Sequence, residues 1–104
     1  MVRGCVLALT RDGRSLLLDV IPIRSGGRLM LNLVVSTPEE GKLCDFQLFS
    51  PSCFDGIDKT MIAFAVKYIL YGILNIEERY ETGRSVFSEV MERIEKIANA
   101  HTSK

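Results

Sequence analysis

Hydrophobic residues follow two different periods along the chain, and the change falls near its middle. In the first half, apolar residues alternate with others, most clearly between Arg28 and Ser36. The alternate positions of that segment are Leu29, Leu31, Leu33 and Val35. In the second half, apolar residues recur at steps of three and four. Alternation is typical of strands and the longer period of helices, so the sequence predicts a sheet followed by helices.

The first half contains four predicted strands joined by short turns. The strands are Val2–Leu9, Ser15–Ile23, Arg28–Ser36 and Leu43–Phe49. The turns lie at 11–14, 25–27 and 37–41, and in the first of them Asp12-Gly13 supplies the positive φ of a tight turn. Short connections join strands that run antiparallel. We therefore expect a four-stranded antiparallel meander.

The first predicted helix covers Lys59–Asn75, with Asp58 as its N-cap. Between Met61 and Ile76, Lys67 is the only charged residue, so the helix is apolar almost all round. A helix on the outside of a sheet normally shows a polar stripe. We therefore expect this helix to be buried, enclosed on several sides and clasped by the sheet.

The second predicted helix covers Ser85–Ala100 and has a narrow apolar stripe. The stripe consists of Phe87, Val90, Ile94 and Ile97, and His101 continues it. This is the spacing of a coiled-coil seam, and two heptads need a partner to be stable in water. The partner is either the first helix of the same chain or a second subunit, and we favour the second subunit. The fold class is thus α+β, with a sheet-plus-helix domain at 1–83 and a C-terminal oligomerisation helix with a short tail at 84–104.

Charge excludes one class of partner. Thirteen basic and thirteen acidic residues give zero net charge, which argues against a nucleic-acid binder held by bulk electrostatics. The charge is uneven, however: residues 1–36 hold five arginines against two aspartates, a net charge of +3. Residues 37–58 hold one lysine against five acids, a net charge of −4. A local basic patch on the first three strands is therefore compatible with the total.

The sequence contains no self-sufficient catalytic or metal-binding motif. Three cysteines, Cys5, Cys44 and Cys53, lack C-x-x-C spacing, and His101 is the only histidine. Buried thiols are favoured over a zinc site or an intermolecular disulfide. An enzyme is the weakest function class, and no cofactor is expected. The start of the chain lacks the pattern of a secretory signal and no apolar run has the length of a membrane span, so we expect a cytoplasmic protein that binds no membrane.

The second face of the predicted sheet is semi-apolar and carries arginines at the strand ends. Apolar and aromatic platforms beside cations suit single-stranded DNA, or RNA, bound without sequence preference. The candidate binding residues are Arg3, Arg14, Arg24, Arg28, Lys42, Phe46, Phe49 and Phe54. In the alternative interpretation, a dimer partner or the C-terminal helix buries this face, and the protein is a homo-oligomeric interaction or scaffold protein. A small-ligand sensor using the same cleft is a third possibility.

The order of these parts resembles that of the ThermoDBP-related single-stranded DNA-binding proteins of thermophilic archaea. The matching segments are Val2–Phe49 for the sheet, Lys59–Asn75 for a gripped helix and Ser85–Ala100 for an assembly helix. The resemblance covers nearly the whole chain and is one of layout. It implies a curved sheet that grips a helix, subunit assembly through the C-terminal helix, and a single-stranded DNA ligand.

Overall fold

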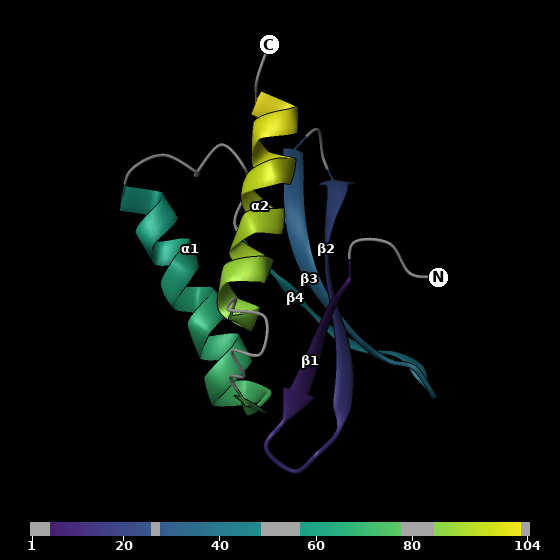
Figure 1. Ribbon diagram of the computed structural model, residues 1–104. Coiled ribbons are helices and arrows are strands. Elements are labelled where there is room, and N and C mark those ends of the chain that lie inside the picture. The colour runs from purple at the N-terminus through teal and green to yellow at the C-terminus, as the bar shows by residue number, and fades with distance from the viewer. Residues whose placement is uncertain (1–4, 26–27, 49–56, 78–84, 103–104) are drawn as a thin grey trace.

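The protein is an antiparallel sheet with two helical layers on one of its faces (Figure 1). The computed structural model describes residues 5–25, 28–48, 57–77 and 85–102. Its elements are β1 (Val6–Thr10), β2 (Ser15–Ser25), β3 (Arg28–Thr37), β4 (Gly41–Gln47), α1 (Ile57–Lys67), the π-helix η2 (Tyr68–Ile73), β5 (Ile76–Glu77) and α2 (Val86–Thr102). The strand order is β4-β3-β2-β1-β5. The predicted α+β class and the meander of the first four strands are therefore confirmed.

The turn between β1 and β2 forms where Asp12-Gly13 predicts it. The Thr10 N–H donates to the Arg14 carbonyl at 2.9 Å, and the Gly13 N–H donates to the Thr10 carbonyl at 3.0 Å. Gly13 has φ 91°, which a residue with a Cβ rarely adopts, whereas Asp12 does not have a positive φ. The turn is thus a tight turn closed by one glycine in the left-handed region.

A fifth strand, β5, was not predicted. It pairs with the end of β1 through Leu9 with Glu77 and Thr10 with Ile76. The Arg11 N–H also donates to the Asn75 carbonyl at 2.9 Å. The sequence shows only a polar connection here, because a strand of two residues is too short to have a period of its own. Its consequence is that the end of η2 is held against the β1–β2 turn.

Helix α2 packs on the sheet, chiefly against β1 and β2. Its apolar stripe therefore faces its own chain and not the second subunit that we favoured from the sequence. Val90 and Ile94 are fully buried in the chain's own core, and Phe87 and Ile97 pack against that core. Of the two partners considered for this seam, the same chain is the one that the structure shows. Residues of α2 and of the sheet share one hydrophobic cluster, so the two predicted domains, 1–83 and 84–104, do not have separate cores.

Helix α1 lies outside α2, so the prediction that it is enclosed on several sides is wrong. In Figure 1, α2 stands between α1 and the sheet, and α2 is the element that α1 chiefly contacts besides its continuation η2. Ile62 and Val66 face inward and are buried, as are Ile69 and Leu70 of η2. The opposite side of the helix is exposed to solvent. In the described part of the chain, no helix has the length and hydropathy to span a membrane.

Candidate functional site

The outward side of α1 is apolar and continues into η2; we call Met61 and Phe64 of α1, together with Tyr68 at the start of η2, the α1 face. Their exposed fractions are 54%, 69% and 68%. They recur at steps of three and four, so they lie along one side of the helix. A surface helix normally exposes its polar residues. Such a run of large exposed apolar side chains makes this face a candidate interaction site.

The lysines of the helix engage α2 rather than extend over the α1 face. The Lys59 ammonium pairs with the Glu95 carboxylate at 2.7 Å. The Lys67 ammonium lies 4.9 Å from the centre of the Phe87 ring, within the range of a cation–π contact. Both partners belong to α2. The usual arrangement of a surface helix is therefore reversed. Two lysines of α1 contact the neighbouring helix α2, while the large apolar side chains of the α1 face are exposed to solvent.

The outer sheet face is the side of the sheet turned away from the helices. Leu7, Ile21 and Ile23 are exposed on it, so its predicted semi-apolar character is present. Two acidic residues at outward positions of the strands are paired: Asp45 contacts Lys42, and Asp19 contacts Arg93 of α2, each at 2.7 Å. Among the described residues, no aromatic side chain lies on this face.

The residues predicted to bind nucleic acid do not form one described cluster. Arg14 is exposed and makes no ion pair with any described residue, whereas Lys42 is paired with Asp45. Phe46 is half-buried and packs against the core, on the inner side of β4. In the pairing of β2 with β3, Arg24 lies opposite Leu29 and Arg28 lies opposite Ser25. The structure describes the backbone of these two arginines but not their side chains. Arg3, Phe49 and Phe54 lie outside the described residues.

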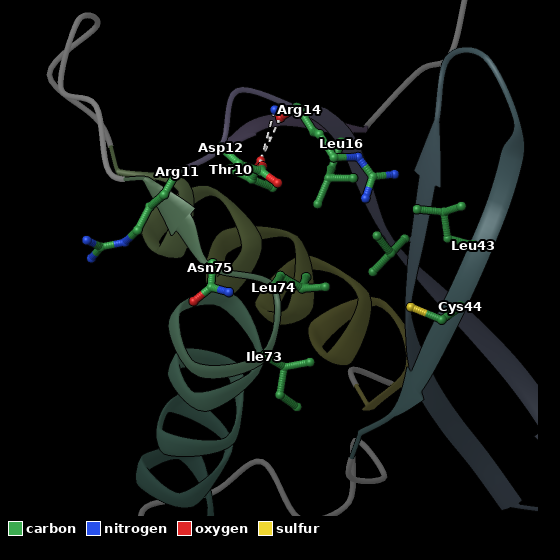
Figure 2. Close-up of a pocket in the computed structure, with 11 residues that line it drawn as sticks. Thr10, Arg11, Asp12, Arg14, Leu16, Leu43, Cys44, Ile73, Leu74 and Asn75 are labelled. Atoms are coloured by element: carbon green, nitrogen blue, oxygen red, sulfur yellow. Dashed lines mark hydrogen bonds between the residues drawn. The ribbon is translucent and has the colours of Figure 1, made fainter.

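A hollow of about 470 Å³ lies where the β1–β2 turn, β3, β4 and the end of η2 meet (Figure 2). Its apolar lining consists of Leu16, Val35, Leu43, Ile73 and Leu74. Its polar lining consists of Thr10, Arg11, Asp12, Arg14, Cys44 and Asn75. The volume lies within the range of small-molecule sites, which is about 300–1,000 Å³. We call this hollow the turn pocket.

Irregular backbone forms much of the wall of the turn pocket. Val35 pairs with Cys44 but Ser36 pairs with Lys42, so Leu43 is the extra residue of a β-bulge. On the opposite wall η2 is a π-helix, in which the Leu74 N–H donates to the Ile69 carbonyl at 2.9 Å. Asn75 then adopts φ 55°. Bulges, π-turns and left-handed residues are destabilising locally and are frequent at functional sites.

The charged side chains beside the turn pocket differ in the contacts that they make. The Thr10 hydroxyl donates to the Asp12 carboxylate. This hydrogen bond lowers the pKa of Asp12, as do backbone N–H groups and the charge of Arg14 to a lesser degree. In Figure 2 the Arg14 side chain extends over the pocket, whereas Arg11 points away from it. Arg14 is thus the cation available to a ligand there.

A second, smaller hollow of about 360 Å³ shares Arg14 with the turn pocket. It lies between the β1–β2 and β3–β4 turns, and Glu39 and Glu40 line it. The carboxylates of these glutamates moderate the positive potential around Arg14. Strong attraction for a polyanion is therefore not expected at this end of the sheet.

The two described cysteines are free thiols in different surroundings. Burial raises the pKa of the Cys5 thiol, and the nearby Asp19 charge raises it further, which makes this thiol less reactive at neutral pH. Cys44 lines the turn pocket and is half-buried. Cys53 lies outside the described residues. Within the described ranges, no three His, Cys, Asp or Glu side chains are placed to hold a metal ion.

Comparison of the chain with models of protein families, with curated proteins and with solved structures finds no match. The similarity to ThermoDBP-related proteins stays a prediction. Three features of the molecule itself are candidate functional sites: the α1 face, the outer sheet face and the turn pocket.

Proposed function

We propose that the protein is a non-catalytic interaction protein that associates with a second copy of itself through the α1 face. The observation that carries this proposal is the exposure of Met61, Phe64 and Tyr68 on one side of a helix whose lysines contact α2. Fully burying one such side chain stabilises a complex by about 1.5–3 kcal/mol. Aromatic residues and methionine are also enriched in protein interfaces.

A second copy suits this face better than a charged partner does. None of the three side chains carries a charge at neutral pH, so the face offers nothing to select a basic or an acidic surface. Two identical helix faces can meet about a two-fold axis, each contributing the same residues. The zero net charge of the chain means that two copies do not repel each other strongly.

Replacing Phe64 with glutamate is expected to convert a dimer to a monomer. The substitution places a charge at the centre of the α1 face, and because Phe64 is 69% exposed the monomer fold should be retained. Desolvating an unpaired carboxylate in the contact should weaken the dimer by at least about 2 kcal/mol, or some thirtyfold in the dissociation constant. Sedimentation equilibrium over a range of protein concentrations measures this dissociation constant.

Leu7→Glu is the matched control for this experiment. Leu7 is 66% exposed, nearly the same as Phe64, but it lies on the outer sheet face. It should leave the dimer intact. A wild-type protein that stays monomeric at high micromolar concentration would refute self-association. If only Leu7→Glu dissociated the dimer, the dimer contact would lie on the sheet and not on the α1 face.

Binding of single-stranded nucleic acid to the outer sheet face is the second candidate function. The observation that favours it is that this semi-apolar face is left uncovered by the helices, with Leu7, Ile21 and Ile23 exposed. Arg14 at the β1–β2 turn is a described candidate cation without an ion pair among the described residues. The proposal is weaker than self-association because Phe46 packs inward and Lys42 is already paired.

Titration with a fluorescent single strand tests this second candidate. Binding at low salt should weaken as salt rises, and Arg14→Gln should reduce the slope of log K against log salt by about 0.7, the value for one single-strand phosphate contact. A duplex of the same length should bind less tightly because its bases cannot stack on the face. Absence of binding at micromolar protein and low salt would end this proposal and leave self-association unaffected.

A further inference from the structure

We propose that the turn pocket binds a small molecule with one anionic group and an apolar body, and that Arg14 is the anchor for the anion. The inference is independent of self-association, because the pocket and the α1 face share no residue. It rests on the apolar walls, on the position of one cation and on the way the backbone forms the site.

The apolar walls provide the reason for an apolar body. Leu43 and Ile73 are exposed, and they belong to opposite sides of the pocket. Leu16 and Val35 form its buried floor between them. A ligand with an aliphatic or aromatic portion would cover the exposed side chains and remove their surface from water, which favours binding.

Arg14 provides the reason for an anion, and its neighbours limit the charge to one. The Arg14 guanidinium extends over the pocket in Figure 2 and has no ion pair among the described residues. Guanidinium groups bind carboxylates with two parallel hydrogen bonds. The Asp12 carboxylate lies beside the same turn, and Glu39 and Glu40 line the hollow on the far side of Arg14. These acids would repel a polyphosphate more strongly than a monoanion.

The backbone departs from regularity at the places that form the pocket. Without the bulge at Leu43, consecutive residues Leu43 and Cys44 would point to opposite faces of the sheet, yet both line this hollow. On the other wall, the π-helix ends at Ile73 and Asn75 turns the chain back to contact Arg11. Such departures persist where a site requires them. Their convergence on one hollow supports a ligand site there.

Hexanoate is the probe for the first test, with 1-hexanol and acetate as matched controls. Hexanol has the apolar body without the charge, and acetate has the charge without the body. Amide shifts in an ¹⁵N-labelled sample should follow hexanoate at residues 10–16, 42–44 and 73–75. Arg14→Gln should weaken hexanoate binding roughly tenfold, as expected for loss of a charge-assisted contact. Lys96→Gln is the control, because Lys96 is exposed on α2 and does not line the pocket, and it should change affinity by less than about twofold.

Several results would overturn the proposal. Shifts confined to another part of the protein would do so, as would no shift at millimolar hexanoate. Equal effects of Arg14→Gln and Lys96→Gln would remove Arg14 as the anchor. Acetate binding as tightly as hexanoate would show that the apolar walls contribute nothing. None of these outcomes depends on the oligomeric state, and the Phe64→Glu variant can be titrated in the same way.

Cys44 offers a second, independent readout of occupancy. In the Cys5→Ser/Cys53→Ser variant, Cys44 is the one remaining thiol, and it lines the turn pocket. Saturating hexanoate should slow its alkylation by the neutral reagent iodoacetamide, whereas acetate should not. An unchanged rate in the presence of a bound probe would place the ligand elsewhere and refute the site.

Discussion

Replacing Ile94 with alanine is expected to lower the free energy of unfolding by about 2–5 kcal/mol, the range for removing a large aliphatic side chain from a core. Ile94 has no exposed surface, and it belongs to the hydrophobic cluster that joins α2 to the sheet and to α1. The substitution leaves a cavity between two layers that cannot both collapse around it. Urea denaturation followed by circular dichroism measures the loss.

Ile97→Ala is the matched control on the same helix. Ile97 is the same residue type but only partly buried against the core, so its removal should destabilise the protein by clearly less. Protein concentration separates the two interpretations of the stripe. If α2 packs within its own chain, the difference between wild type and Ile94→Ala is the same at low and high concentration. A difference that appears only at high concentration would restore α2 as a subunit interface.

The sheet could be predicted from the sequence because its signals are local. Alternation along β3 and a turn glycine between apolar runs specify strand and register together. Gly13 and Gly41 do have the positive φ that their turns require. Thr37 accepts a hydrogen bond from the Glu40 N–H at 2.9 Å in the later turn, so side-chain chemistry contributes there too.

The packing of the helices could not be predicted in the same way. Periodicity shows which side of a helix is apolar, but not which element covers it. The narrow stripe containing Val90 and Ile94 suits a helix buried within its own chain as well as a coiled coil, and it joins the cluster formed by the sheet and α1. The all-round apolar character of α1 has two explanations, enclosure or an exposed contact surface. The exposure of Phe64 favours the second.

No residue pattern in the sequence predicts the turn pocket. Its walls come from segments far apart in the chain, such as Leu16, Leu43 and Ile73. The bulge at Leu43 and the π-helix depend on how β4 and η2 meet the rest of the fold, and neither has a residue pattern of its own. Asn75 is the exception in part, since asparagine tolerates the left-handed region better than most residues.

An ion pair between the sheet and α2 should also contribute to stability. The pairing of β1 with β2 ends at Val6 and Leu18 within the described residues, and the next residue of β2 is Asp19. Its Oδ1 accepts from the Val20 N–H at 2.9 Å and from Nη2 of Arg93 at 2.7 Å. The Nε of Arg93 is buried and has no partner in the described structure. The Asp19 carboxylate therefore compensates the charge of the partly buried Arg93 guanidinium.

Asp19→Asn is expected to lower the free energy of unfolding by about 1–3 kcal/mol, because it leaves the Arg93 charge without its counter-ion. Asp45→Asn is the control: the Lys42–Asp45 pair is more exposed, at 59% and 37% against 30% and 26% for the Arg93–Asp19 pair, so its loss should matter by less than about 0.5 kcal/mol. Arg93→Met completes a double-mutant cycle. If the pair acts as one unit, Asp19→Asn in the Arg93→Met background should be nearly neutral. Additive effects of the two substitutions would show that the Asp19 carboxylate acts independently of Arg93, and that Arg93 contributes mainly by packing.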